Sequence, residues 1–172
     1  MTRYLKPMPL RLRLALLLLC LFLPAAASAA CADLAYKQFD FWLGDWNVSN
    51  TAGKLIGRDH VTRAFGGCVV QEAWTSVEGG TGGSFSMYDI SRKFWHQTWV
   101  DSSGTLVVLE GGLKGDRMVL TGQQVDHEGK AEQTRMIWTV EGAKVRQLWQ
   151  ASPDGGKTWN TIFEAIYSKA DD

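Results

Sequence analysis

Polar residues precede tryptophans by two positions at three places in the sequence. The pairs are Glu72 with Trp74, Gln97 with Trp99, and Gln147 with Trp149. Because side chains two residues apart lie on the same face of a β-strand, each polar group would lie beside an indole ring. Three such strands around one cavity would give an indole-walled pocket with a few hydrogen-bonding groups, the usual composition of a small-molecule site. Arg135 joins this candidate ligand-binding set as a further polar group.

The same residues fit a second interpretation, in which the indoles form the core and the polar side chains bond one another or face solvent. Eight tryptophans are more than the packing of a small domain needs, yet indole is common in barrel cores. Ligand binding and core packing both stay open for this set.

Sequence motifs of familiar catalytic and metal centres are absent. There is no G-x-S-x-G elbow, no H-E-x-x-H zinc motif and no Walker loop, and no metal-ligating residues flank the cysteines. Glu72 and Glu110 are the one candidate carboxyl couple for glycosidase-type chemistry. The sequence therefore favours binding of a small molecule over catalysis and predicts no metal. There are two alternatives: an enzyme that acts on a small substrate in the same cavity, and a module whose exposed aromatic residues contact a protein partner.

Turn signals divide the chain from Asp45 onward into runs of about 8 to 12 residues, a spacing typical of antiparallel strands. The turns are expected at 52–53, 66–67, 78–83, 91–93, 102–104, 114–116, 127–129, 141–142 and 153–156. Nine turns imply ten strands, and a ten-stranded meander best satisfies its two edges by closing on itself. We expect an all-β, antiparallel up-and-down barrel, with residues 32–39 forming a short helix near the N-terminus.

The N-terminal segment has the layout of a secretory signal peptide. Four basic residues precede an apolar run from Leu14 to Leu23, and the small residues that follow allow cleavage after Ala29 or Ala30. An uncleaved anchor is the alternative, because the apolar segment approaches the length of a membrane-spanning helix. We expect residues 1–30 to be a signal peptide and residues 31–172 to be a single domain, periplasmic or secreted and free of the membrane after cleavage.

The charge balance of the expected mature chain is mildly acidic. The first thirty residues hold four of the 18 basic residues and no acidic ones, which leaves 14 basic against 18 acidic residues, a net charge of −4. No basic run remains. This argues against nucleic acid and against an anionic membrane surface as partners.

Two cysteines remain after residue 30, Cys31 and Cys68. In an oxidising compartment an isolated pair is most simply a disulfide, which here would tie the N-terminus to the body of the domain. Cys31 also follows Ser28-Ala29-Ala30 and so has the position of a lipidated first residue. Ser28, however, occupies the place where such a signal normally has leucine.

The octet Phe39-Asp40-Phe41-Trp42-Leu43-Gly44-Asp45-Trp46 resembles the opening F-D-F-W-L-G-[DE]-W of a widespread family of exported bacterial proteins of unknown function. Later segments extend the resemblance over nearly the whole chain after residue 30: 67–74, 84–89, 95–101 and 152–159. The Gly44-x-Trp46 within the octet is also similar to the first-strand signature of lipocalins and related calycin barrels. This resemblance implies a lipocalin-like barrel whose closed end is plugged by Trp46.

In lipocalins the corresponding tryptophan packs against an arginine of a late strand, and Arg146 is the best counterpart here, with Arg135 second. Such a cation–π contact contributes roughly 0.5 to 2 kcal/mol. Related nitrobindin-like barrels bind haem through a histidine near the C-terminus. The histidines of this chain are His60, His96 and His127, none of them in the expected last strand. We therefore expect no haem and no other cofactor.

Residues 152–159 fit the pattern S-x-D-x-G-x-T-W, known as an Asp-box in β-propellers. The pattern builds a hydrogen-bonded hairpin turn, with the hydroxyls and the carboxylate bonded to the loop backbone. A propeller would need several copies, so a structural role is expected for one copy. The residues concerned are Ser152, Asp154, Gly156, Thr158 and Trp159.

Overall fold

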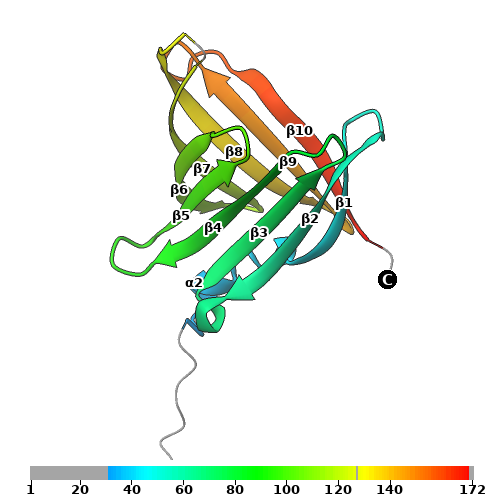
Figure 1. Cartoon of the computed structure of the whole chain (residues 1–172). Coiled ribbons are helices and arrows are strands. Elements are labelled where there is room, and N and C mark those ends of the chain that lie inside the picture. The colour runs from blue at the N-terminus through cyan, green and yellow to red at the C-terminus, as the bar shows by residue number, and fades with distance from the viewer. Residues whose placement is uncertain (1–30, 127, 171–172) are drawn as a thin grey trace, which may run out of the picture.

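The computed structural model describes residues 31–126 and 128–170, so the expected signal peptide and His127 lie outside the described residues. Ten antiparallel strands follow one another in sequence order and close into one barrel in which β1 is hydrogen-bonded to β10 (Figure 1). The strands are β1 (Gly44–Ser49), β2 (Leu55–Ala64), β3 (Val69–Ser76), β4 (Thr81–Asp89), β5 (Phe94–Asp101), β6 (Leu106–Lys114), β7 (Arg117–Val125), β8 (Ala131–Glu141), β9 (Lys144–Ser152) and β10 (Asn160–Lys169). The predicted ten-stranded up-and-down barrel is confirmed.

Alternation along the strands separates the interior of the barrel from its surface. On β8, Thr134, Met136 and Trp138 are buried, whereas Arg135 and Ile137 between them are not. Because successive side chains of a strand point to opposite faces, the buried set faces the lumen and the other set faces outward.

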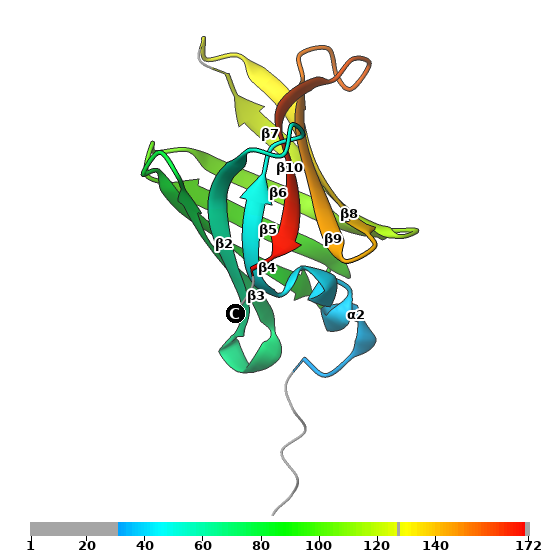
Figure 2. The same cartoon turned by 90° about the vertical axis from the view of Figure 1, so that its right-hand side faces the viewer.

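The two ends of the barrel differ. At the closed end lie the connections 90–93, 115–116 and 142–143 together with α2 (Leu34–Lys37) and η1 (Asp40–Trp42). Figure 2 shows α2 below the strands of the barrel. The opposite end, here called the mouth, carries the connections 50–54, 77–80, 102–105, 126–130 and 153–159. The short helix near the N-terminus was expected from the sequence and covers the closed end. No helix among the residues described is long and apolar enough to cross a membrane.

An aromatic cluster fills the closed end. Phe39 stacks on Trp42 with ring centroids 5.0 Å apart, and both pack against Trp138. All three side chains are fully buried. The Trp46 Nε1–H donates to the Trp42 carbonyl at 2.8 Å, which joins η1 to the first strand. This end of the lumen is therefore solid core.

The cation over Trp46 is Lys169, and the expectation that Arg146 would hold this place is wrong. The Lys169 Nζ lies 3.7 Å from the Trp46 ring centroid, and the two residues are directly opposite one another on β10 and β1. Arg146 alternates with buried Val145 and Gln147, so it faces outward and pairs with Glu164. The expected cation–π contact to Trp46 is therefore present, but its cation comes from the last strand, β10.

Position 44 requires a glycine because of its backbone conformation and because Lys169 lies close to it. Its φ of +129° is a conformation that residues with a Cβ rarely adopt, and a Cβ would lie 2.2 Å from the Lys169 Nζ. The lysine also donates to the Leu43 carbonyl at 2.6 Å. The glycine thus lets the chain enter β1 with Lys169 laid across it.

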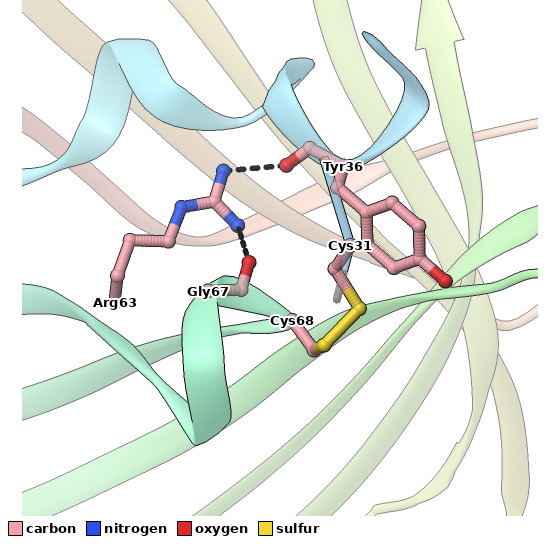
Figure 3. The surroundings of a disulfide bond; sticks show 5 residues. All are labelled: Cys31, Tyr36, Arg63, Gly67 and Cys68. Carbon is pink, nitrogen blue, oxygen red and sulfur yellow. Dashed lines mark hydrogen bonds between the residues drawn. A yellow bond between two sulfur atoms is a disulfide. The ribbon is translucent and has the colours of Figure 1, made fainter. Parts of the chain in front are cut away.

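A disulfide between Cys31 and Cys68 fastens the N-terminal segment to the connection between β2 and β3, which contains η2 (Phe65–Gly67) (Figure 3). Beside it, Arg63 donates to the carbonyls of Gly67 at 2.9 Å and of Tyr36 at 2.5 Å. The covalent bond and the arginine hold the same two segments together.

The 152–159 turn is built as the Asp-box pattern predicts. The Asp154 carboxylate accepts from the backbone N–H groups of Lys157 and Thr158 and from the Ser152 and Thr158 hydroxyls. These hydrogen bonds lower the pKa of Asp154 to about 2. The Gly156 N–H donates to the Ser152 hydroxyl, which completes a structural turn at the mouth.

Candidate functional site

A cavity of about 140 Å³ lies within the barrel, on the mouth side of the aromatic cluster. Strands β3, β5, β8, β9 and β10 contribute its lining: Glu72, Trp74, Trp99, Met136, Gln147, Trp149, Phe163 and Tyr167. Trp149 also borders a wider groove of about 910 Å³ between the mouth ends of β6, β7, β9 and β10. The cavity thus has an apolar wall, a few polar groups and a route toward the surface.

Two glycines make room for the indoles of the cavity wall. A Cβ on Gly57 would lie 2.3 Å from Cη2 of Trp74, and a Cβ on Gly82 would lie 2.5 Å from Cζ2 of Trp99. Each indole therefore lies over the backbone of the neighbouring strand. The Trp74 ring also packs edge-on against Phe163 of β10, with ring centroids 6.4 Å apart.

Two of the wall indoles have their N–H groups bonded to the protein. The Trp149 Nε1–H donates to the Thr134 hydroxyl at 2.7 Å, and the Trp99 Nε1–H donates to the Asp101 carboxylate at 3.2 Å. These bonds fix the orientation of both rings. They also mean that the two rings offer a ligand apolar surface and no hydrogen-bond donor.

A buried polar chain begins at Glu72 in the cavity and continues along β4 and β5. The Ser84 hydroxyl donates to the Glu72 carboxylate at 2.5 Å, and the Gln97 side-chain amide donates to Ser84 at 3.3 Å and to Ser86 at 2.9 Å. All four residues are buried. The chain fixes the Glu72 carboxylate with one of its oxygens already bonded.

Gln147 and Tyr167 form the other polar contact of the lining. The Tyr167 hydroxyl donates to the Gln147 side-chain carbonyl, and the Gln147 amide points at the Met136 sulfur at 3.4 Å. Sulfur is a weak acceptor, so this amide keeps donor capacity. Burial raises the pKa of the Tyr167 hydroxyl, with a further contribution from the Asp59 and Glu72 carboxyls, so the phenol is neutral.

Asp59 on β2 is the second carboxyl of the site, next to Glu72. The side chain of Asp59 is only 3% exposed, and neither of its oxygens has a hydrogen-bond partner in good geometry. Burial first, and then the neighbouring Glu72 charge, raise the pKa of Asp59 to about 10. Burial also raises the pKa of Glu72 to about 7, against the lowering effect of its hydrogen bonds to Ser84 and Asp59. The pair holds one to two protons at neutral pH and titrates as a unit.

No cation neutralises this carboxyl pair in the part of the chain that the structure describes. Neither carboxyl takes part in an ion pair, and no cation contributes to the pKa of either group. The inward-pointing basic side chains lie at the closed end, where Arg63 pairs with Asp40 and Lys169 lies over Trp46. The pair is thus a buried acidic centre without a counter-ion.

The structure brings together five of the seven candidate ligand-binding residues, namely Glu72, Trp74, Trp99, Gln147 and Trp149. Gln97 is buried beside the cavity and reaches Glu72 through Ser84, without lining the space itself. Arg135 does not belong to the site. It alternates with inward-facing Thr134 and Met136, so it faces outward, bonds Gln150 and stacks on Trp159 at 3.9 Å.

The suggested Glu72–Glu110 couple is not formed. Glu110 lies on the outer face, where it contacts Arg92 and His96. The partner of Glu72 is Asp59, which the sequence analysis missed. The alternation of β2 could have identified Asp59 as an inward-facing residue. Asp59 is in phase with the buried residues Gly57 and Val61, and its sequence neighbours Arg58 and His60 face outward.

Side chains that could ligate a metal ion are dispersed in the described ranges. Residues 31–126 and 128–170 contain no group of three or more His, Cys, Asp or Glu side chains that could hold a metal ion. His60 contacts Asp45 and His96 contacts Glu110, both on the outer face of the barrel.

In comparisons with known proteins, no protein-family model matches the sequence, and no curated protein matches it significantly. The resemblance of the Phe39–Trp46 octet to exported bacterial proteins therefore stays a prediction. Site geometry alone has to carry the functional conclusion.

Proposed function

We propose that this protein is an exported carrier or receptor that binds a small, partly apolar molecule inside its barrel. One observation carries the proposal: tryptophans from three strands surround an unfilled cavity into which a buried carboxyl points. Buried polar groups without protein partners are costly to maintain in a fold. A ligand that contacts them would offset that cost.

Export is the second part of the proposal. It is supported by the signal-like sequence of residues 1–30 and by the Cys31–Cys68 disulfide, a bond that persists in oxidising compartments. Intact mass measurement of the secreted chain should give a species beginning at Ala30 or Cys31, with no thiol accessible to labelling. A lipid adduct on Cys31 with a labelled Cys68 would instead identify a lipoprotein.

Native mass spectrometry of the protein purified from its own compartment tests the binding function. We expect a population with added mass that disappears on denaturation. The variants Trp99→Ala and Trp149→Ala should lose the adduct, and Ile137→Ala, an outward-facing control on β8, should keep it. A wild-type protein without adduct that also binds none of the small probes described below would contradict the proposal.

Catalysis in the same cavity is the second candidate, and the Asp59–Glu72 pair is the observation that favours it. A carboxyl whose pKa is raised by burial to about 7, as that of Glu72 is, is suited to general acid–base chemistry. Incubation with a metabolite extract separates the two functions. Turnover of a compound beyond one equivalent, lost in Glu72→Gln, indicates an enzyme; stoichiometric retention indicates binding.

A further inference from the structure

The one charged group that lines the cavity, the Glu72 carboxyl, is a hydrogen-bond acceptor when ionised. Glu72 accepts from Ser84 through one carboxylate oxygen, and the adjacent Asp59 carboxyl is hydrogen-bonded to Glu72. The indole N–H groups of Trp99 and Trp149 are bonded to protein oxygens, and the Tyr167 hydroxyl is bonded to Gln147. The Gln147 amide, aimed at sulfur, and the Trp74 indole N–H keep donor capacity, but both groups are neutral. A ligand that complements this site therefore donates hydrogen bonds.

The charge of the site also favours a ligand that donates hydrogen bonds. The carboxyl pair lies in the interior without any basic side chain of the described chain beside it. A buried carboxylate is stable only when it is paired or protonated, and at neutral pH a proton now serves that purpose. A cationic group entering the cavity would replace this proton and restore a full ion pair.

The wall suits a cation as well. Trp74, Trp99 and Trp149 surround the space next to Glu72. The faces of tryptophan rings attract organic cations more strongly than those of other aromatic residues, and the attraction grows when water is excluded. A carboxylate at the base with indoles at the sides is the arrangement expected for recognition of an ammonium group and its apolar substituents.

The volume limits the size of the group that is enclosed. About 140 Å³ is close to the volume of an apolar cavity that holds one benzene molecule. A longer ligand would extend past Trp149 into the mouth groove, whose apolar lining includes Leu106, Val107 and Ile162. The enclosed part is thus a head group with a small apolar body.

We propose that the ligand is an organic cation, a protonated amine whose ammonium group contacts Glu72 and whose benzene-sized apolar part packs between Trp74, Trp99 and Trp149. This inference rests on the proposed binding function and narrows it to one chemical class. Asp59 acts as a positioning residue behind Glu72: it keeps its own proton, and the proton that leaves to solvent when a cation binds is that of Glu72.

The test compares three probes of nearly equal shape: benzylamine, benzyl alcohol and benzoate. Their affinities are measured by calorimetry at pH 8, where Glu72 has lost its proton and the amine keeps its own. We expect benzylamine to bind at least tenfold more tightly than benzyl alcohol and benzoate to bind most weakly. Equal binding of the amine and the alcohol would overturn the cation inference while leaving the binding function intact.

Two variants locate the effect. Glu72→Gln keeps an acceptor for Ser84 and removes the charge, so the preference for amine over alcohol should fall to within about threefold. Asp116→Asn removes one exposed charge at the closed end, where the side chain is 83% exposed, and should leave the preference unchanged. If Asp116→Asn reduces the preference as much as Glu72→Gln does, attraction by net charge explains it and the inference fails.

Wild-type pH dependence gives a readout that needs no variant. The titratable groups that act on Glu72 are Asp59 from β2 and Tyr167 from β10, and both keep their protons at neutral pH. Benzylamine affinity should therefore rise several-fold between pH 6 and pH 8 as Glu72 ionises, and benzyl alcohol affinity should stay flat. Flat amine affinity over this range would contradict the assignment of Glu72. If none of the probes binds, the cation inference is overturned, and native mass spectrometry decides the binding function separately.

Discussion

Tryptophan lines the barrel interior at both levels, but its role differs between the closed end and the cavity. At the closed end, Trp42 and Trp138 are fully buried and contact each other and Phe39. In the cavity, Trp99 and Trp149 are partly exposed, are bonded through their N–H groups to strand side chains, and line the empty space. The same residue type therefore fills space at one level and encloses it at the other.

The neighbours of each indole explain the difference. Trp74 and Trp99 lie against Gly57 and Gly82 of adjacent strands, which hold the rings flat on the wall. Trp42 comes from η1, which is not part of the barrel wall, and it meets aromatic rings of β8 and β10. Whether an indole is core or wall is thus decided by what lies beside it and across from it.

Truncating one tryptophan from each level should give the largest contrast. Trp138→Ala removes a fully buried indole from the core and should lower the free energy of unfolding by about 3 to 5 kcal/mol. Trp149→Ala enlarges an existing cavity and should cost about 1 to 2 kcal/mol, because the ring is already partly exposed. Urea denaturation followed by circular dichroism measures both. Equal losses would mean that the cavity wall is ordinary core.

Removing the disulfide should affect the closed end and spare the cavity. The bond links residues 37 positions apart, and losing a crosslink of this kind typically costs about 2 to 4 kcal/mol. Cys31→Ser/Cys68→Ser should therefore be destabilised by that amount while keeping its probe affinity. A double variant that folds as stably as the wild type but binds nothing would place the role of the disulfide at the site.

The carboxyl pair should make stability fall as pH rises. Folding favours the protonated forms, so the contribution is complete below the ordinary pKa values near 4 and is lost as pH rises through about 7 for Glu72 and about 10 for Asp59. Asp59→Asn removes one ionisation and should be more stable than the wild type by about 1 to 3 kcal/mol at pH 9, with a smaller difference at pH 4. Parallel stability curves of the two proteins between pH 4 and pH 9 would contradict the raised pKa of Asp59.

Glycine substitutions give the smallest and most local contrast. Gly44→Ala meets both an unfavourable φ and Lys169, and should cost about 1 to 2 kcal/mol without changing probe affinity. Gly82→Ala should cost about 1 kcal/mol, because the end of the Trp99 ring can move into the lumen. That movement should weaken binding of benzyl alcohol several-fold. A change in affinity for Gly44→Ala alone would reverse the assignment of the two ends.

The barrel could be predicted from the sequence, because turn residues and the two-residue alternation of buried and exposed side chains reflect the backbone conformation directly. Five cavity residues follow from the same period, since a polar residue two places before a tryptophan must share its face. Arg135 was assigned wrongly because membership in the set was inferred from residue type, against the phase of Thr134 and Met136 on its own strand. Alternation, applied strictly, would have excluded it.

Other features of the site depend on pairings between strands that no local pattern reports. Asp59 meets Glu72 through the register of β2 against β3, and Lys169 meets Trp46 through closure of β10 on β1. The cation over Trp46 was therefore assigned to the wrong strand. Phe163 and Tyr167 were missed for the same reason, since both reach the cavity from the closing strand.

The indole N–H resonances of the protein test the central claim most directly, because each reports on one level of the barrel. In a ¹⁵N-edited NMR titration with benzylamine, the account predicts large shift changes for Trp74, Trp99 and Trp149 and small ones for Trp42 and Trp138. Resonances are assigned by single Trp→Phe variants. Shifts confined to the closed-end pair, or no shifts at a concentration that saturates calorimetric binding, would show that the ligand does not enter this cavity.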